Sequence, residues 1–420
     1  MEKKRYALVG TGNRGLGMFA RPLAADFPDT AELVALCDIN PLRMTAAAAE
    51  AGLDIPQFTS FADMMGATDP DAVIVATRDC THAEYVVGAL DAGKRAISEK
   101  PLCTTAEQCR DILAAERASD ATCLVTHNAR YGAADTKIRE LVSAGRIGTP
   151  LFIQFDETLD RCHGADYFRR WHRRMADSGG LLVHKACHHF DCVNWWADSA
   201  PARVAAHGSL RFYGSNGPFR GPRCSNCPHT DECDFHVDIF RRDTYRKLYR
   251  EAESADGYHR DGCVFDPEVD IYDQMGVLIR YENGIECSYT LTAYCPYESQ
   301  RVVIEGTEGR LEYFGRSATG FAAGSQHLPG IEEIATEWLK LYLPAEGAID
   351  VPIDRVTGGH GGADPQLRHD FFARDWALEP NDRMASLDQA VQAVLIGAAA
   401  NQSIAEGGRP IDIQALITPR

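Results

Sequence analysis

The sequence predicts an α/β protein with two domains: a parallel sheet covered by helices on both faces, then an α+β domain with a mostly antiparallel sheet. Three observations support this prediction. Strands and helices alternate over the first 128 residues, a glycine-rich turn follows the first strand, and strand-like segments dominate after residue 129. The length of 420 residues also suits two domains better than one.

Short apolar runs alternate with helical segments throughout the first half of the chain. The run Ala-Val-Ile-Val-Ala at residues 72–76 predicts a strand buried on both faces, because it has no polar side. The other expected strands are residues 6–9, 32–37, 95–98 and 123–126. The expected helices are residues 14–27, 41–51, 82–92 and 105–119, with Gly93 ending the third and Thr104 or Thr105 capping the fourth. This alternation is typical of a parallel sheet.

The pattern changes after residue 129. Helices are expected over residues 131–144 and 180–197, and a long helix over 385–406 could pack back on the first domain. The expected strands are residues 151–158, 204–212, 276–281, 285–293, 301–305 and 309–313, with a hairpin turn at Asn283-Gly284. We therefore divide the chain into residues 1–128 and 129–420, with a cysteine-rich insertion over about 211–263.

Composition and charge argue against several classes of function. Apolar residues make up 45% of the chain and charged residues 25%, which is ordinary for a globular protein. The formal net charge of −17 would repel a phosphate backbone, so we expect no nucleic-acid partner. No apolar run approaches the roughly 20 residues of a membrane helix, and the N-terminus lacks the features of a signal peptide. We therefore expect a cytoplasmic protein that does not associate with membranes.

The turn after the first strand has the pattern G-x-G-x-x-G, which indicates dinucleotide binding when a strand precedes it and a helix follows. Such a turn lets the backbone approach a pyrophosphate, and the helix N-terminus offers unpaired N–H groups. The second strand ends in Asp38, whose carboxylate can accept hydrogen bonds from a ribose and repels a 2′-phosphate. This favours NAD over NADP, although Arg43 leaves some tolerance of NADP. The expected cofactor residues of the turn are Gly10, Gly12, Asn13, Arg14 and Gly15.

A second motif, Ser98-Glu99-Lys100-Pro101, closes a strand of the same domain. With the glycine-rich turn, it makes the chain resemble the Gfo/Idh/MocA family, which includes glucose–fructose oxidoreductase and inositol dehydrogenase. The resemblance runs nearly end to end, through residues 75–77 with His82, 92–101, 127–131, 179–191 and 301–309. It implies an N-terminal Rossmann domain followed by a C-terminal α+β domain with an open-faced sheet, a homodimer or homotetramer, and Lys100 and His188 facing the substrate. It also implies further cofactor contacts, from Thr77, His82, Glu99, Lys100 and Asn128.

The two implied site residues suit the oxidation of a carbinol. His188 can take the hydroxyl proton because an imidazole titrates near neutral pH, and Lys100 can donate a hydrogen bond to the developing alkoxide. The family usually has an aspartate four residues before the histidine, where this chain has His184. Because positions i and i+4 share a helix face, we expect His184 to reach the site as a third catalytic residue.

Two interpretations of this departure from the family remain open. Proton transfer could be shared differently, with Lys185 involved. Alternatively, His184 and His188 could bind a catalytic metal with a third ligand such as His163 or His360.

A polar and aromatic segment at residues 163–172 precedes the helix expected over 180–197 and should form a loop on the substrate side. Tyr and Trp rings can stack on a sugar, and Arg can bind its hydroxyls or a carboxylate. Packing within the loop is the alternative role for the same residues. The candidate substrate-binding residues are His163, Tyr167, Arg169, Trp171, His172 and Lys185.

Four of the 14 cysteines form a separate pattern: Cys224, Cys227 and Cys233 lie close together, and Cys263 follows. Four thiolates suit tetrahedral Zn²⁺, which could stabilise a loop that has no core of its own. We expect structural zinc here. An iron–sulfur cluster, free thiols and a disulfide are the alternatives, and a reducing compartment disfavours the disulfide.

Three functions fit these features. The first is an NAD-dependent oxidoreductase that transfers a hydride between the nicotinamide and a hydroxyl of a sugar, an inositol-like polyol or a glycoside. The second is a glycosidase or eliminase that uses tightly bound NAD, forms a transient keto-sugar and releases no net NADH. The third is a non-catalytic dinucleotide sensor, which would be expected to lose Lys100 or His188.

Overall fold

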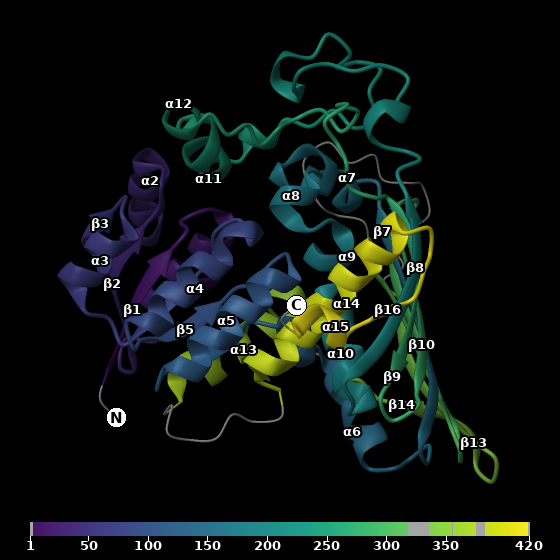
Figure 1. Ribbon diagram of the computed structural model, residues 1–420. Helices are drawn as coiled ribbons and strands as arrows, with labels where there is room; N and C mark the ends of the chain where they lie inside the picture. The colour runs from purple at the N-terminus through teal and green to yellow at the C-terminus, as the bar shows by residue number, and fades with distance from the viewer. Residues whose placement is uncertain (1–2, 318–335, 355, 375–382, 419–420) are drawn as a thin grey trace.

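The structure, a computed structural model, describes residues 3–317, 336–354, 356–374 and 383–418. Within these residues it contains two sheets with helices packed around them (Figure 1). The first sheet has seven strands in the order β15-β6-β5-β4-β1-β2-β3, and β15 alone is antiparallel to its neighbour. Its strands are β1 (Lys4–Val9), β2 (Ala31–Cys37), β3 (Gln57–Phe58), β4 (Ala72–Val75), β5 (Arg95–Ser98), β6 (Cys123–Val125) and β15 (Ala385–Ser386).

Helices pack on both faces of this sheet. Successive residues of each strand point to opposite faces, so each strand contributes side chains to two apolar cores. On β1, Ala7 and Val9 join one apolar core, while Tyr6 and Leu8 join the other. The helices of this half are the π-helical turn η1 (Gly15–Ala20), α1 (Arg21–Ala25), α2 (Pro41–Ala51), α3 (Phe61–Thr68), α4 (His82–Asp91) and α5 (Ala106–Ala118). The expected parallel sheet with helices on both faces is confirmed.

The second sheet has nine strands within the described residues, in the order β14-β13-β12-β11-β7-β10-β9-β8-β16. Only β7 and β10 pair in parallel, so the expectation of a mostly antiparallel sheet is also confirmed. Its strands are β7 (Pro150–Asp160), β8 (Pro201–Ser209), β9 (Gln274–Tyr281), β10 (Glu286–Cys295), β11 (Glu298–Gly306), β12 (Arg310–Ser317), β13 (Thr336–Leu343), β14 (Gly347–Val351) and β16 (Ile411–Asp412).

The helix expected over residues 180–197 is in fact two helices. α9 (Leu181–His184) ends before Lys185, and α10 (Cys187–Ala197) begins after Ala186. The remaining helices are α6 (Ala133–Ser143), α7 (His163–Arg169), α8 (Met175–Ser178), α11 (Asp243–Tyr245), α12 (Glu253–Asp256), α13 (Ala363–Arg368), α14 (Leu387–Ala405) and α15 (Gln414–Ile417). Lys185 and Ala186 therefore interrupt the expected helix between His184 and His188.

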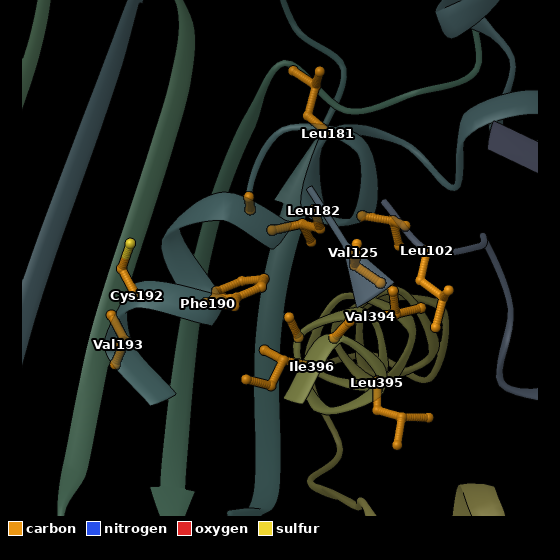
Figure 2. Close-up of a cluster of buried hydrophobic side chains, with 14 of the residues drawn as sticks. Leu102, Val125, Leu181, Leu182, Phe190, Cys192, Val193, Val394, Leu395 and Ile396 are labelled. Carbon is orange, nitrogen blue, oxygen red and sulfur yellow. The ribbon is translucent and has the colours of Figure 1, made fainter. Parts of the chain in front are cut away.

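The long helix α14 lies between the two sheets and contacts both halves of the molecule. It begins with a capping box in which Ser386 accepts from the backbone of Gln389, and Gln389 reciprocates. Figure 2 shows Val394 and Ile396 of this helix in one apolar cluster with Leu182 of α9 and Val125 of β6. The preceding strand β15 pairs with β6, so the C-terminal part of the chain extends the first sheet.

A buried ion pair ties the connection between the halves to α10. Arg130, in the turn after β6, donates to both carboxylate oxygens of Asp191 at 2.6 and 2.7 Å. Their side chains are 1% and 0% exposed. Arg130 also donates to Gln389 of α14 at 3.0 Å. A bidentate pair in such surroundings fixes orientation, and removing one partner leaves an uncompensated charge.

We expect Asp191→Asn to lower the free energy of unfolding by about 3–5 kcal/mol, because the buried Arg130 guanidinium loses its counter-ion. Asp198→Asn is the matched control at the end of the same helix. Asp198 pairs with Arg139 at 3.4 Å and its side chain is 84% exposed, so we expect a loss below about 1 kcal/mol. Urea denaturation followed by circular dichroism measures both, and equal losses would contradict the structural role of Asp191.

Candidate functional site

The glycine-rich turn between β1 and η1 is tight enough to exclude side chains. Gly10 has a φ of +92°, and a Cβ atom there would lie 2.4 Å from the carbonyl oxygen of Ala76. A Cβ on Gly15 would lie 2.0 Å from the carbonyl oxygen of Gly10. Gly12 faces the hydroxyl of Tyr249, which a Cβ would approach to 3.5 Å. The turn therefore has the close backbone geometry that a bound pyrophosphate requires.

Asp38 closes β2 beside this turn. Its carboxylate accepts from the backbone N–H and the hydroxyl of Thr11, both at 2.8 Å, and from the N–H of Asn40 at 2.9 Å. Arg43, on α2, lies 3.5 Å from Asp38 and pairs at 2.7 Å with Asp256 of the insertion. The guanidinium of Arg43 is therefore balanced by two carboxylates.

Arg14, Glu99 and Asn128 are joined through a residue of a distant loop. Arg14 pairs with Glu99 at 2.7 Å and with Asp364 at 3.5 Å, and Asn128 donates to Asp364 at 2.8 Å. Burial raises the pKa of Asp364, but the hydrogen bond from His360 and the charge of Arg14 outweigh it and hold this pKa well below its usual range. These three predicted cofactor residues therefore lie together at one edge of the sheet.

His82 is buried between two turns of the first half. Its ring nitrogens lie 2.7 Å from the carbonyl oxygen of Pro101 and 3.3 Å from that of Thr77, and the residue is 1% exposed. Thr77 also accepts from the hydroxyl of Thr81 at 2.8 Å. His82 thus joins the turn after β4 to the turn after β5, where Glu99 and Lys100 lie.

Lys100 extends from the end of β5 to the helix pair of the second half. Its ammonium donates to the backbone carbonyl of His184 at 3.1 Å. Burial lowers the pKa of Lys100, and the thiol of Cys187 and the carboxylate of Asp79 oppose that shift. Lys100 therefore lies at the contact between the two halves, as a donor with a weakened hold on its proton.

His188, in the first turn of α10, is a neutral imidazole at neutral pH. Burial lowers its pKa well below the usual value, and the nearby charge of Lys100 adds to the effect. Its Nδ1 atom is buried with no hydrogen-bond partner among the described residues. Its ring centroid lies 6.2 Å from that of His127. A neutral imidazole with a free nitrogen can accept a proton.

His184 is the last residue of α9, and Lys185 and Ala186 separate it from α10, which carries His188. The Nδ1 of His184 lies 2.5 Å from a carboxylate oxygen of Asp79, which follows β4. Burial raises the pKa of Asp79 and lowers that of His184, so both shifts favour the uncharged forms of the pair. Sequence reasoning missed Asp79, although a carboxylate just after a fully buried strand was a signal that could have found it.

The predicted substrate residues fall into two groups. The His163 ring bridges Glu298 at 2.9 Å and the hydroxyl of Tyr167 at 2.9 Å. Trp171 stacks on His172 with ring centroids 3.7 Å apart, and His172 lies 4.1 Å from the His184 ring.

Arg169 points elsewhere and donates to the thiol of Cys224 at 3.3 Å. It therefore belongs to the cysteine cluster rather than to the substrate-side group, because its charged end is already engaged there.

Lys185 reaches a buried carboxylate that the sequence did not single out. Its ammonium lies 3.3 Å from Glu157 of β7. Burial raises the pKa of Glu157 to about 7, and Lys185 opposes the shift. Glu157 also lies 3.7 Å from His189. Lys185, Glu157 and His189 therefore form a second buried polar group beside the helix pair.

The four cysteines of the insertion line one cavity of about 20 Å³ together with Arg169 and His236. All 14 cysteines are free thiols, and the described residues contain no group of three or more His, Cys, Asp and Glu side chains that could hold a metal ion. The prediction of zinc at Cys224, Cys227, Cys233 and Cys263 is therefore not supported.

The alternative metal site at His184 and His188 is not supported either. His184 is bonded to Asp79, and the suggested third ligands are engaged elsewhere, His163 with Glu298 and His360 with Asp364. The helices of the described residues include none that is long and apolar enough to cross a membrane.

Comparison with known proteins identifies relatives of both halves. A family model described as an oxidoreductase family with an NAD-binding Rossmann fold matches residues 4–127. The model of the C-terminal alpha/beta domain of the same family matches residues 139–413.

Individual relatives agree with these matches. YteT of Bacillus subtilis, provisionally described as an oxidoreductase, is 32% identical over 98% of both chains. Inositol 2-dehydrogenase 3 of Saccharopolyspora erythraea is 40% identical over 35% of this chain and 43% of its own. A solved levoglucosan dehydrogenase in complex with NADH and L-sorbose has the same fold, with a TM-score of 0.69 and 20% identity over 98% of this chain and 99% of its own.

Proposed function

The chain belongs to the Gfo/Idh/MocA oxidoreductase family, and we propose that it is an NAD-dependent enzyme that oxidises or reduces a hydroxyl-bearing carbon of a sugar, polyol or glycoside. The observation that supports this most directly is the contact between the end of β5 and the α9–α10 helix pair. Lys100 donates to the carbonyl of His184 at 3.1 Å, and its charge acts on the imidazole of His188. The ammonium donor Lys100 and the neutral base His188 therefore lie near each other at this contact.

The protein's residues divide the work of alcohol oxidation. His188 accepts the hydroxyl proton on its imidazole, which burial keeps uncharged and ready to bind it. Lys100 donates a hydrogen bond to the substrate oxygen and stabilises negative charge on it. A nicotinamide cofactor held by the first half would supply the hydride acceptor for this oxidation. The same groups act in reverse for reduction of a ketone.

Arg43 supports the choice of NAD over NADP. A 2′-phosphate would need a free cation near the adenine ribose, but Arg43 is already paired with Asp256 and close to Asp38. Asp38 is 8% exposed and its two oxygens accept hydrogen bonds from the glycine-rich turn and from Asn40. Its carboxylate would repel a 2′-phosphate in a poorly solvated position.

The surroundings of the helix pair fit a substrate with many hydroxyl groups. Tyr167, Lys185 and His163 offer donors and acceptors, and the Trp171–His172 stack offers an apolar face. Aromatic faces with polar edges suit sugar rings. Relatives named inositol 2-dehydrogenase and levoglucosan dehydrogenase are consistent with this substrate class.

A second candidate function is a glycosidase or eliminase that retains NAD and forms a transient keto-sugar. The Asp79–His184 pair favours it, because elimination needs a further acid or base beside the one that takes the hydroxyl proton. The two functions differ in net NADH, which a dehydrogenase releases and an eliminase does not.

The first experiment screens polyols, sugars and glycosides for a rise in NADH absorbance, with product analysis by chromatography. We expect Lys100→Met to lower kcat by about 10²–10³ and His188→Gln by about 10²–10⁴. Product formed without NADH would favour the eliminase. Wild-type rates in both variants would refute the assigned roles.

The pH dependence of kcat/KM tests His188 as the base. A base must be neutral, so activity falls as pH drops through its pKa. Because burial lowers the pKa of His188, we expect the acidic limb to lie below pH 6.5, the usual imidazole value. The limb should be missing from the residual activity of His188→Gln. An acidic limb at or above pH 6.5 would contradict the assignment.

Cofactor preference tests Asp38. We expect kcat/KM with NAD to exceed that with NADP by about tenfold or more, and Asp38→Ser to reduce this ratio about tenfold, since a factor of ten corresponds to only about 1.4 kcal/mol of charge repulsion. Glu32→Ser, at an exposed position of the same strand, should leave the ratio unchanged. A ratio unaffected by Asp38→Ser would count against the proposed preference.

A further inference from the structure

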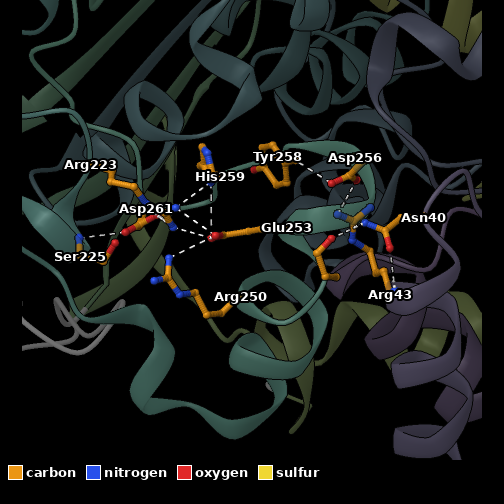
Figure 3. Close-up of polar contacts among 11 residues, drawn as sticks. Asn40, Arg43, Arg223, Ser225, Arg250, Glu253, Asp256, Tyr258, His259 and Asp261 are labelled. Atoms are coloured by element: carbon orange, nitrogen blue, oxygen red, sulfur yellow. Dashed lines mark hydrogen bonds and ion pairs between the residues drawn. The ribbon is translucent and has the colours of Figure 1, made fainter.

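Part of the insertion between β8 and β9 packs on the dinucleotide-binding half. We call residues 243–261 the arm; it contains α11 and α12, which lie near α2 in Figure 1. Asn40 donates to the carbonyl of Ala252 at 2.9 Å, and Arg43 pairs with Asp256 at 2.7 Å (Figure 3). A further pair joins Lys247 to Glu50 at 2.7 Å. These contacts place the arm over the end of the sheet where the glycine-rich turn lies.

The arm is a built element rather than a loose loop. Leu248 is 0% exposed and Tyr249 is 5% exposed, and both belong to the apolar core of the first half. At the other side, Arg223 binds Glu253 and Asp261, which holds the arm to the rest of the insertion (Figure 3). Side chains that the arm carries are therefore positioned by packing on both sides.

One of these side chains already occupies an amide of the glycine-rich turn. The hydroxyl of Tyr249 accepts from the backbone N–H of Asn13 at 2.8 Å. Asn13 is a variable position of the G-x-G-x-x-G turn, whose N–H groups bind a pyrophosphate in this type of site. Tyr249 therefore lies where a phosphate oxygen of a dinucleotide would be expected.

The arm also carries a buried cation, Arg260, that has no carboxylate of its own. Arg260 is 7% exposed, and its guanidinium carbon lies 4.5 Å from the ring centroid of Tyr249 and 4.8 Å from that of Tyr245. Burial disfavours the charge of Arg260, while Tyr249 and the carboxylate of Asp166 act in the opposite direction and raise its pKa. Asp166 forms its ion pair with Arg170, at 2.8 Å, so Arg260 shares this carboxylate with a second arginine. A buried cation with only a shared counter-ion is costly, because leaving water costs several kcal/mol per ion. The position of Arg260 beside Tyr249 puts this cation next to the amide end of the turn.

A second cation and a buried hydroxyl lie along the same surface. The guanidinium carbon of Arg78, which follows β4, lies 5.4 Å from the ring centroid of Tyr258 of the arm. The hydroxyl of Tyr258 is buried with no hydrogen-bond partner among the described residues. The two arginines and two tyrosines together offer hydrogen-bond donors to a compact anion with several oxygen atoms.

We propose that the arm completes the dinucleotide site: Tyr249 and Arg260, with Arg78 from the first half, bind the pyrophosphate of NAD, and the arm closes over the bound cofactor. This rests on the proposed function only in requiring that NAD binds. Arg260 supplies the counter-charge to the pyrophosphate, and the Tyr249 hydroxyl moves from the Asn13 amide to a phosphate oxygen. Uptake and release of NAD then require the arm to lift from α2.

Binding measurements on the full-length protein test the role of Arg260. Isothermal titration calorimetry gives Kd for NADH, for ADP-ribose, which keeps the pyrophosphate, and for adenosine, which lacks it. We expect Arg260→Gln to raise the Kd for NADH and for ADP-ribose about tenfold or more, and to leave the Kd for adenosine unchanged. Arg246→Gln is the matched control on the same arm, since Arg246 is exposed and paired with Asp243, and it should bind like the wild type.

The outcomes separate this inference from the proposed function. A wild type that binds no NADH contradicts the proposed function itself. If the wild type binds NADH and Arg260→Gln binds it with the same Kd, only the inference is overturned. The same holds if Arg260→Gln raises KM for the sugar and leaves the Kd for NADH unchanged. Binding of inorganic pyrophosphate that depends on Arg260 while NADH binding does not would also overturn it, because the site would then serve a free phosphate.

Hydrogen exchange on the wild type keeps the inference testable if Arg260→Gln fails to fold. We expect NADH and ADP-ribose to slow amide exchange in residues 243–261, and adenosine to leave it unchanged. Exchange in the arm that is the same with and without NADH, at concentrations that saturate binding, would overturn the inference.

Discussion

The bidentate ion pair between Arg130 and Asp191 is the constraint on which the geometry of the site depends. The proposed donor, Lys100, belongs to the first sheet, whereas the proposed base, His188, belongs to a helix of the second half. Arg130 connects the crossover after β6 to α10 and to α14, and neither carboxylate nor guanidinium is exposed. His188 and Asp191 are three residues apart on α10, so fixing one fixes the other. A small rotation between the halves would separate the base from the amine.

Local patterns predicted the first half of the fold well and the details of the site less well. The helix over 41–51 and the strand over 95–98 agree residue for residue, because their apolar patterns and caps are local. No local pattern marks the interruption at Lys185, nor the long-range contacts beside it, of His184 with Asp79 and of Lys185 with Glu157. Arg169 likewise points to Cys224 because of the distant insertion. Such partners come from long-range packing, which periodicity does not report.

Burial governs the electrostatics of the site more than the overall charge does. The chain carries a formal charge of −17, yet Arg78, Lys100 and Arg260 lie where anionic or polar ligands would bind. Desolvation lowers the pKa of Lys100 and His188 and raises that of Asp79. Each shift disfavours the charged form, so the interior holds groups that can exchange protons near neutral pH. The same desolvation makes the buried Arg260 costly. Its electrostatic partner Asp166 is shared with Arg170, so a further anion beside Arg260 would be stabilising.

The insertion links the two ends of the site physically. Its cysteine cluster holds Arg169 of α7, the helix that also carries Tyr167, while its arm holds Arg43 of α2 beside Asp38. The same 211–263 segment thus touches the substrate-side group and the dinucleotide-side group. If the arm lifts to exchange NAD, Arg223 must transmit that motion toward Cys224, because it binds both Glu253 and Asp261 and lies next to Cys224 in sequence. On this proposal, movement of the arm would also act on the substrate side of the insertion. A ligand bound at one side would then bias the other to the extent that it favours one position of the arm.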